Sequence, residues 1–298
     1  MELIKVVPRG YCKGVVRAIN IAKETAKNNP NEKIYILGML VHNKYVIEAL
    51  KEYNIITIDD KNKTREELLE QINDGIVIFT AHGIHPLVKK KAEEKGLRCI
   101  DASCLDVLKT QNIVHDYLNQ GYEILYIGKN KHPEASAVCD HNDHVHLIEK
   151  EEDILNLPKF DKVFVTNQTT MSYHDVKHLF NTIKNVFPNV IISDEICNAT
   201  RSRQEAITKL KNIDALIVVG DKASNNANRL AQIAKEQGIT NVYLIDDVND
   251  LNVNEIHLFK RVAITAGAST PTYLINQVIY CIENKICEPQ IIEKDKIL

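Results

Sequence analysis

The stretch PRGYCKGVV at residues 8–16 decides how this sequence is organised. A mostly apolar run at residues 3–7 leads into it, and apolar side chains with helical spacing follow at residues 15–22. This pattern predicts a strand followed by a helix, with Cys12 at the turn between them. The dipole at a helix N-terminus stabilises a thiolate, so this position suits a metal ligand.

Two further cysteines have the same setting. Cys104 lies 92 residues after Cys12, and Cys197 lies 93 residues after Cys104. Each comes after an apolar run that predicts a strand and before a segment that predicts a helix. A nearly constant period indicates three related α/β units, which we expect to span residues 1–96, 97–189 and 190–298.

Composition narrows the class of protein. With 298 residues and 44% hydrophobic content, the chain can fill the cores of two or three small domains. A net charge of −3 gives no general case for nucleic-acid binding. No apolar run reaches about 18 residues and no signal peptide is evident, so we expect no membrane span and a cytoplasmic protein. Seven cysteines without dense spacing favour metal or redox chemistry over disulfides.

Each predicted unit has three corners where a strand ends and a helix begins, and the first corner carries the cysteine. The other two corners carry polar side chains: His42, His132 and Ser224 at the second corner, and His82, Thr169 and Ser269 at the third. In parallel sheets, ligands bind at the carboxyl ends of the strands. We therefore predict an α/β fold of three small units with mostly parallel sheets, arranged in pseudo-threefold fashion around a central cavity.

The three thiolates could hold zinc or an iron–sulfur cluster. Catalytic zinc keeps three protein ligands, but zinc ligands usually come in close-spaced pairs, which are missing here. A [4Fe–4S] cluster is normally held by four thiolates, so three would leave one iron open to an oxygen of a substrate.

The remaining corner residues suit an anionic substrate. His, Ser, Thr and Asn side chains and exposed backbone N–H groups at helix N-termini can hold a phosphate or diphosphate. Glu134 stands two residues after His132, and a buried Glu beside an anion has its pKa raised, which suits a proton donor.

Nine short motifs occur in a fixed order along almost the whole chain. They are PRGYCKGV (8–15), VHN (41–43), AHG (81–83), DASC (101–104), HPE (132–134), TNQTTMS (166–172), ICNATRSRQ (196–204), SNNANRL (224–230) and TAGAST (265–270). Through this set, the chain resembles the 4-hydroxy-3-methylbut-2-enyl diphosphate reductase family, the last enzymes of the non-mevalonate isoprenoid pathway.

The resemblance implies a complete site. Cys12, Cys104 and Cys197 would hold a [4Fe–4S] cluster with one open iron. Thr169 would position the substrate hydroxyl, and Glu134 with His132 would relay protons. The diphosphate would be bound by His42, His82, His132, Ser224, Asn225, Asn226 and Ser269.

The resemblance also implies the reaction and its partners. The substrate would be a small allylic diphosphate, reduced to isopentenyl and dimethylallyl diphosphate with electrons from ferredoxin or flavodoxin. We expect a monomer with no nucleic-acid or membrane partner.

The chain departs from the family pattern at three places. Leu105 stands where the family usually has Pro, residues 135–140 lack the family's glycines, and Asn225 replaces the second of two adjacent serines. Two other classes of function therefore stay open: a non-catalytic iron–sulfur sensor or phosphate-binding protein, and a zinc-dependent hydrolase. Retention of Glu134 and Thr169 favours the enzyme over the sensor.

The other cysteines and several histidines have simpler interpretations. We expect Cys99, Cys281 and Cys287 to be small buried hydrophobic residues. A second group could be mistaken for a zinc site, but it lies in a polar loop and we favour no metal there: Cys139, His141, His144 and His146.

Overall fold

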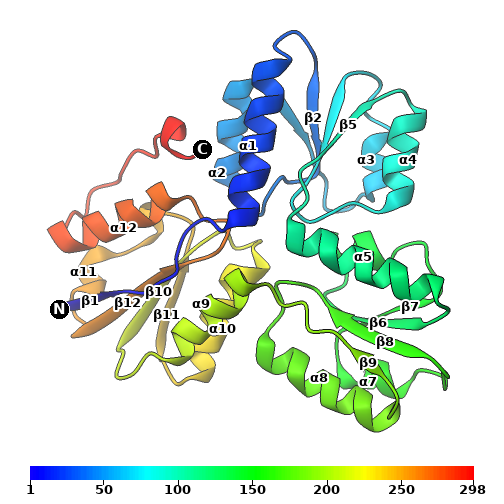
Figure 1. Ribbon diagram of the computed structural model, residues 1–298. Helices are drawn as coiled ribbons and strands as arrows, with labels where there is room; N and C mark the ends of the chain where they lie inside the picture. Colours follow the sequence, from blue (N-terminus) through cyan, green and yellow to red (C-terminus); the bar gives the residue numbers. More distant parts are fainter. The chain divides into compact units, whose positions relative to one another are not determined.

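The computed structural model describes residues 1–298 and contains three four-stranded sheets (Figure 1). In spatial order they are β11 (Asn241–Ile245), β10 (Ala215–Val219), β12 (Arg261–Ala266) and β1 (Glu2–Lys5); β3 (Ile55–Ile58), β2 (Ile34–Leu37), β4 (Ile76–Phe79) and β5 (Arg98–Asp101); and β7 (Val145–Ile148), β6 (Glu123–Ile127), β8 (Val163–Asn167) and β9 (Ile191–Ile192). Parallel pairing joins the strands of each sheet. The predicted α/β class with parallel sheets is confirmed.

The three sheets share one topology. In each, the chain forms a central strand (β2, β6 or β10), moves to the edge strand on one side, and then crosses to the other side for the third strand. The direction of winding therefore reverses between the first and third strands. Such a reversal leaves a crevice at the carboxyl ends of these two strands, where ligands bind in open α/β sheets.

The fourth strand of each sheet crosses a predicted boundary. β5 pairs with β4, β9 pairs with β8, and β1 pairs with β12 at the other end of the chain. The strand that opens each predicted unit thus completes the sheet of another unit. The division into residues 1–96, 97–189 and 190–298 stays a prediction about segments of the chain. Each sheet contains strands from two of these segments.

Helices cover both faces of the sheet that contains β6. Side chains of β6 alternate, so that Ile124 and Tyr126 pack under α5 (Leu105–Asn119) and α6 (Pro133–Cys139). Leu125 and Ile127 pack on the other face, against α7 (Glu151–Leu155) and α8 (Tyr173–Val186). This period of two is the geometry of a strand that is buried on both faces.

The other sheets are covered in the same way. The helices α9 (Asn198–Thr208) and α10 (Asn225–Glu236) pack on one face of the sheet with β10, and α12 (Thr272–Asn284) lies on the other with α11 (Val253–Ile256) beside it. The helices α3 (Arg65–Leu69) and α4 (Pro86–Glu94) pack on the sheet with β4. The remaining helices are α1 (Lys13–Asn28) and α2 (Lys44–Leu50), with short 3-10 turns at Lys51–Tyr53, Val248–Asp250 and Lys294–Lys296. None of the helices combines the length and the apolar character needed to span a membrane.

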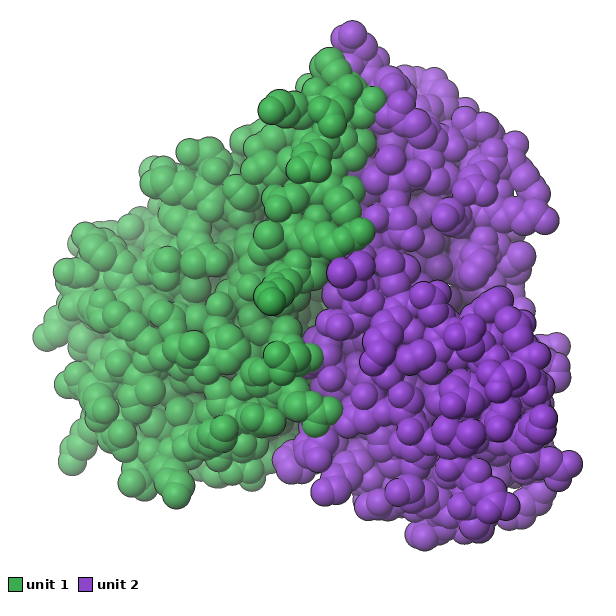
Figure 2. Space-filling view, viewed as in Figure 1, with its two compact units in different colours: residues 1–30, 39–56, 198–298 green, residues 31–38, 57–197 purple.

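The chain forms two compact units (Figure 2). Unit 1 consists of Met1–Pro30, Met39–Ile56 and Asn198–Leu298, and unit 2 of Asn31–Gly38 and Thr57–Cys197. Unit 1 holds the sheet with β10, and unit 2 holds the sheets with β4 and β6. Cys12 therefore belongs to unit 1, whereas Cys104 and Cys197 belong to unit 2.

Three strands were absent from the sequence prediction, which gave three strands to each unit. They are the outer strands β3, β7 and β11. Each is short and at least half of its side chains are partly exposed, because an edge strand is covered less completely than a central one. Their sequences therefore lack the continuous apolar run by which the central strands were predicted.

We predict that Gly83→Ala destabilises unit 2 more than Gly96→Ala does. Both glycines have positive φ, 85° and 75°, where an alanine costs about 1–2 kcal/mol. A Cβ on Gly83 would also lie 2.8 Å from Nε2 of Gln111 and 3.0 Å from Val107, whereas nothing lies within 4 Å of one on Gly96. Urea unfolding should give Gly83→Ala an additional loss of about 1 kcal/mol or more. Equal losses of stability in the two variants would show that Gln111 and Val107 of α5 move aside without cost.

Candidate active site

The three cysteines occupy equivalent places. Cys12 and Cys104 are the N-cap residues of α1 and α5, and Cys197 immediately precedes α9. Each cysteine N–H donates to a carbonyl in the loop after the neighbouring strand, as follows: Cys12 to Ala268 O (2.9 Å), Cys104 to Ala81 O (2.9 Å) and Cys197 to Thr169 O (3.1 Å). The predicted strand-to-helix setting is confirmed for all three.

The thiols suit a soft metal centre. None of the three is in a disulfide and all are partly exposed, and neither Cys12 nor Cys104 uses its sulfur to cap its helix. Such sulfurs at helix N-termini are chemically fit to be thiolate ligands of an iron–sulfur cluster. Within the two units, however, no group of three or more His, Cys, Asp or Glu side chains is placed to hold a metal ion. The ligand role of the three cysteines stays a prediction.

Of the three cysteines expected to be small buried residues, only one is fully buried. Cys281 is buried in α12 as expected, but Cys99 is only partly buried. Cys287 is exposed, so the expectation was wrong there. It follows the end of α12 in the C-terminal segment, where no sheet covers it.

In unit 2, Glu134 and Thr169 form the central contact of the candidate site. Glu134 is in the first turn of α6, and Thr169 lies in the loop after β8. The Thr169 N–H donates to Oε1 of Glu134 at 2.6 Å, and the Thr169 hydroxyl lies 3.1 Å from Oε2. Both residues are almost fully buried, at 2% and 3% exposure. The sequence predicted the two residues for one site, and the structure brings them together.

The surroundings of Glu134 determine the pKa of its carboxyl group. Burial is the largest influence and raises the pKa of Glu134 from 4.5 to about 7. The two hydrogen bonds from Thr169 lower the pKa, and so does the proximity of the Tyr126 hydroxyl, while Asp106 raises it further. The predicted upward shift is confirmed, and its main cause is burial in the protein. A carboxyl group with this pKa can give or take a proton at neutral pH.

His132 and His82 lie beside this pair. His132 is the N-cap of α6, and its Nδ1 accepts the N–H of Glu134 at 3.2 Å. A neutral ring that accepts at Nδ1 carries its proton on Nε2. The ring centroids of His82 and His132 are 5.8 Å apart, in an edge-to-face arrangement. Two of the predicted anion-binding histidines are thus neighbours.

In unit 1, the predicted anion-binding residues are joined by backbone groups. The Ser269 hydroxyl donates to His42 O at 2.9 Å. Oδ1 of Asn226 accepts the N–H of Ala268 at 3.0 Å, and Ala268 O accepts from Cys12. These bonds hold Asn226 and Cys12 at the backbone of Ala268, and they tie the adjacent Ser269 to the loop of His42.

The N-terminus of α10 lies in the same set. Ser224 is the N-cap, and its Oγ accepts the N–H of Ala227 at 3.4 Å, which leaves the hydroxyl proton available for another acceptor. Asn225 and Asn226 form the first turn of this twelve-residue helix. An N-terminus with polar side chains on its first turn can receive an anion.

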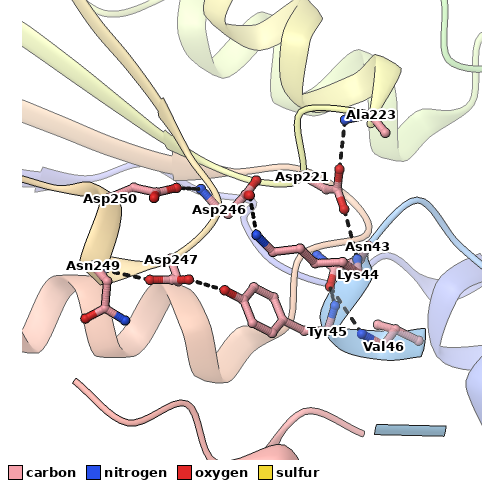
Figure 3. Close-up of polar contacts among 10 residues, drawn as sticks. All are labelled: Asn43, Lys44, Tyr45, Val46, Asp221, Ala223, Asp246, Asp247, Asn249 and Asp250. Atoms are coloured by element: carbon pink, nitrogen blue, oxygen red, sulfur yellow. Dashed lines mark hydrogen bonds and ion pairs between the residues drawn. The ribbon is translucent and has the colours of Figure 1, made fainter. Parts of the chain in front are cut away.

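The loop that carries His42 is fixed by contacts that the sequence did not predict (Figure 3). Asn43 caps α2 by accepting from Tyr45 N and Val46 N. The N–H of Lys44 donates to Asp221 at 2.9 Å, and Asp221 also accepts from Ala223 N at 2.8 Å. Asp221, in the loop after β10, therefore has a structural role in holding two loops together.

Two more contacts complete this network. The ammonium group of Lys44 forms an ion pair with Asp246, and the Tyr45 hydroxyl donates to Asp247. Asp246 and Asp247 follow directly after β11. An Asn before a helix signals a cap, so Asn43 could have been found from sequence. The Asp partners lie some two hundred positions away and could not.

The group that might be mistaken for a zinc site is used differently. His141 pairs with Glu66 at 2.6 Å, and His144 and His146 each bind Glu123 at 2.8 Å. Burial raises the pKa of the Cys139 thiol to about 12, so it stays protonated at neutral pH. The three histidines thus pair with two carboxylates, Glu66 and Glu123.

Comparisons with known proteins agree with the motifs. The chain matches the family model described as "LytB protein" over residues 3–283. A protein of Anoxybacillus flavithermus named 4-hydroxy-3-methylbut-2-enyl diphosphate reductase is 49% identical over 287 residues, which cover 95% of this chain and 90% of the relative. A protein of Listeria monocytogenes with the same name is 51% identical over 288 residues, covering 95% and 86%.

Two solved structures are similar in fold. The structure of E-1-hydroxy-2-methyl-but-2-enyl-4-diphosphate reductase from Plasmodium falciparum has a TM-score of 0.85 and 31% identity, and the match covers 97% of this chain and 88% of that one. A structure of (E)-4-hydroxy-3-methyl-but-2-enyl diphosphate reductase, described as the terminal enzyme of the non-mevalonate pathway, has a TM-score of 0.67 and 32% identity, covering 95% and 100%.

We predict that Glu134→Gln changes how stability depends on pH. Between pH 4.5 and about 7, folded Glu134 holds its proton while the unfolded chain loses it. The free energy of unfolding therefore falls as pH rises through this range, by about 3 kcal/mol. Gln removes this contribution, so urea unfolding at pH 5 and pH 8 should show a smaller loss in the variant. The same exchange at the exposed Glu94 controls for loss of a charge. Identical pH dependence in wild type and Glu134→Gln would contradict the shift.

Proposed function

The chain belongs to the LytB protein family, and we propose that it reductively removes the hydroxyl group of 4-hydroxy-3-methylbut-2-enyl diphosphate. Two electrons and two protons convert this allylic alcohol into water and isopentenyl or dimethylallyl diphosphate. One proton leaves with the hydroxyl oxygen, and the other is added to carbon. The observation that carries the proposal is buried Glu134, whose pKa of about 7 and contacts to Thr169 suit a proton donor.

The geometry of Glu134 indicates a direction for the proton. Oε1 accepts the Thr169 N–H, which cannot accept a proton in return, so neutral Glu134 carries its proton on Oε2. Oε2 lies 3.1 Å from the Thr169 hydroxyl. Protonated Glu134 donates to this hydroxyl, which turns its own proton toward the substrate oxygen. Loss of the oxygen as hydroxide in a buried site would be costly, and this relay avoids that cost.

Neutral donors bind the diphosphate in this proposal. In unit 2 they are Nε2–H of His132 and the neighbouring His82. In unit 1 they come from the α10 N-terminus and the loops joined to it: Ser224, Asn225, Asn226, Ser269 and His42. Hydrogen bonds to a charged group contribute about 1.5–3 kcal/mol each, so several neutral donors suffice without Lys or Arg.

Cys12, Cys104 and Cys197 would hold the [4Fe–4S] cluster. When bound, the cluster supplies electrons and an open iron that acts as a Lewis acid. The backbone bonds of the cysteines to Ala268, Ala81 and Thr169 fix each thiol next to a loop with a substrate-binding or proton-relay residue. We further propose that ferredoxin or flavodoxin provides the electrons, and that the enzyme is a cytoplasmic monomer.

We predict that Cys12→Ser, Cys104→Ser and Cys197→Ser each lower the iron content of anaerobically purified protein severely. A serine hydroxyl is a poor ligand for iron compared with a thiolate. Cys99→Ser is the matched control, because Cys99 lies in β5 shortly before Cys104 and should keep full iron. Iron content and visible absorption measure the outcome. A Cys104→Ser protein with full iron content would contradict the assignment of Cys104 as a cluster ligand.

We predict that Glu134→Gln slows turnover about 100-fold or more while iron content and substrate binding persist. Gln keeps the shape and the contact to Thr169 N, but it cannot supply a proton. The assay uses a reduced dye with the diphosphate substrate under anaerobic conditions. A variant with nearly the wild-type rate would mean that protons come from elsewhere, with His132 the next candidate.

A further inference from the structure

The hydroxyl group of Tyr126 is a polar group within an apolar layer of unit 2. Tyr126 lies in central strand β6, is fully buried and packs with Val114, Ala135, Val138 and Phe164. Its hydroxyl oxygen makes no hydrogen bond. A buried hydroxyl without a partner is destabilising, and Phe would fill the same space without that cost. Packing alone therefore does not account for a tyrosine here.

The ring of Tyr126 leads toward the start of α6. A Cβ on Gly128 would lie 3.0 Å from Cε1 of Tyr126 and 3.4 Å from the Cβ of Ala135. Because Gly128 has no side chain, the edge of the Tyr126 ring can lie close to its backbone. The same space borders Ala135, the residue that follows Glu134. From this position the hydroxyl lowers the pKa of the Glu134 carboxyl group, although the two do not meet hydrogen-bonding geometry.

We propose that Tyr126 is a positioning residue for Glu134, whose carboxylate accepts a hydrogen bond from the Tyr126 hydroxyl after Glu134 has given up its proton. While Glu134 is protonated, Oε1 accepts from Thr169 N and Oε2 faces the Thr169 hydroxyl, so both oxygens are engaged. Ionisation leaves a buried charge with free lone pairs, and a nearby donor is then needed. The role in proton delivery rests on the proposed function, whereas the contact itself does not.

Other groups around Glu134 do not replace Tyr126. Asp106, from α5, is an anion and disfavours the charged carboxylate. His132 uses Nδ1 to accept from the Glu134 N–H, and His82 lies against His132. Cys139, at the end of α6, is a partly buried thiol near Tyr126 whose raised pKa keeps it neutral.

A competing partner for the tyrosine is Thr166. It is the register neighbour of Tyr126 on β8, is fully buried, and has an Oγ1 that makes no hydrogen bond. Thr166→Val therefore belongs in the test, because it removes this partner and keeps the shape.

The experiment titrates the Glu134 carboxyl group in cluster-loaded protein by infrared difference spectroscopy. Each protein is compared with the same protein carrying Glu134→Gln, which isolates one carboxyl band. Wild type should titrate near pH 7, and Tyr126→Phe should titrate about one pH unit higher, because the ionised form loses a donor. Tyr117→Phe is the matched control, since Tyr117 stacks on Phe164 in the same layer. Tyr117→Phe and Thr166→Val should both leave the midpoint of the Glu134 titration unchanged.

Unfolding and turnover provide further readouts. Tyr126→Phe should lose stability at pH 8, where Glu134 is charged, and not at pH 5. In the pH profile of turnover, the fall in rate on the alkaline side should move to higher pH together with the carboxyl titration. An unchanged midpoint in Tyr126→Phe, or an equal shift in Thr166→Val, would overturn the proposal. Wild-type turnover in Glu134→Gln would instead defeat the proposed proton source and leave the titration result intact.

Discussion

The rest of the site depends on one backbone hydrogen bond that occurs three times. Each cysteine N–H donates to a carbonyl in the loop that follows the neighbouring strand: Ala268, Ala81 or Thr169. This bond is possible because the strand before each cysteine pairs in parallel with the strand before that loop. Parallel pairing brings the carboxyl ends of both strands to one edge. The sheet therefore fixes each thiol next to a polar loop before any ligand is present.

Central features of the fold could be predicted because they depend on local apolar runs. The strands β4, β6 and β10 are apolar throughout or nearly so, and the turn after each carries Gly or polar residues. The repeat of the cysteines correctly indicated three similar α/β sheets. The sequence could not reveal that β1 completes a sheet with β12, since this pairing joins the two ends of the chain. Nor could it reveal the short, partly exposed edge strands.

The motifs indicated the candidate site residues and the upward pKa shift of Glu134, but not the partners of each side chain. Glu134 and Thr169 are 35 positions apart, and only the fold shows that both carboxylate oxygens face the same threonine. From the sequence alone, the environment of Asp221 could not be distinguished from that of Glu134. Asp221 is tied to the N–H groups of Lys44 and Ala223, whereas Glu134 is closed off from water in α6. Burial, which depends on the whole unit, decides which carboxylate can carry a proton at neutral pH.

A carboxyl group suited to proton delivery must be buried enough to hold its proton and paired well enough to release it. Burial alone would keep Glu134 neutral, and the hydrogen bonds of Thr169 alone would keep it charged. Both hydrogen bonds of Thr169 favour the anion, and in the proposed relay the Thr169 hydroxyl would also accept the proton. Its carbonyl also accepts the Cys197 N–H, so one loop contacts both the carboxyl group proposed to give the proton and a proposed cluster ligand. In the proposed reaction, a change that shifted this loop would therefore disturb proton transfer and electron transfer together.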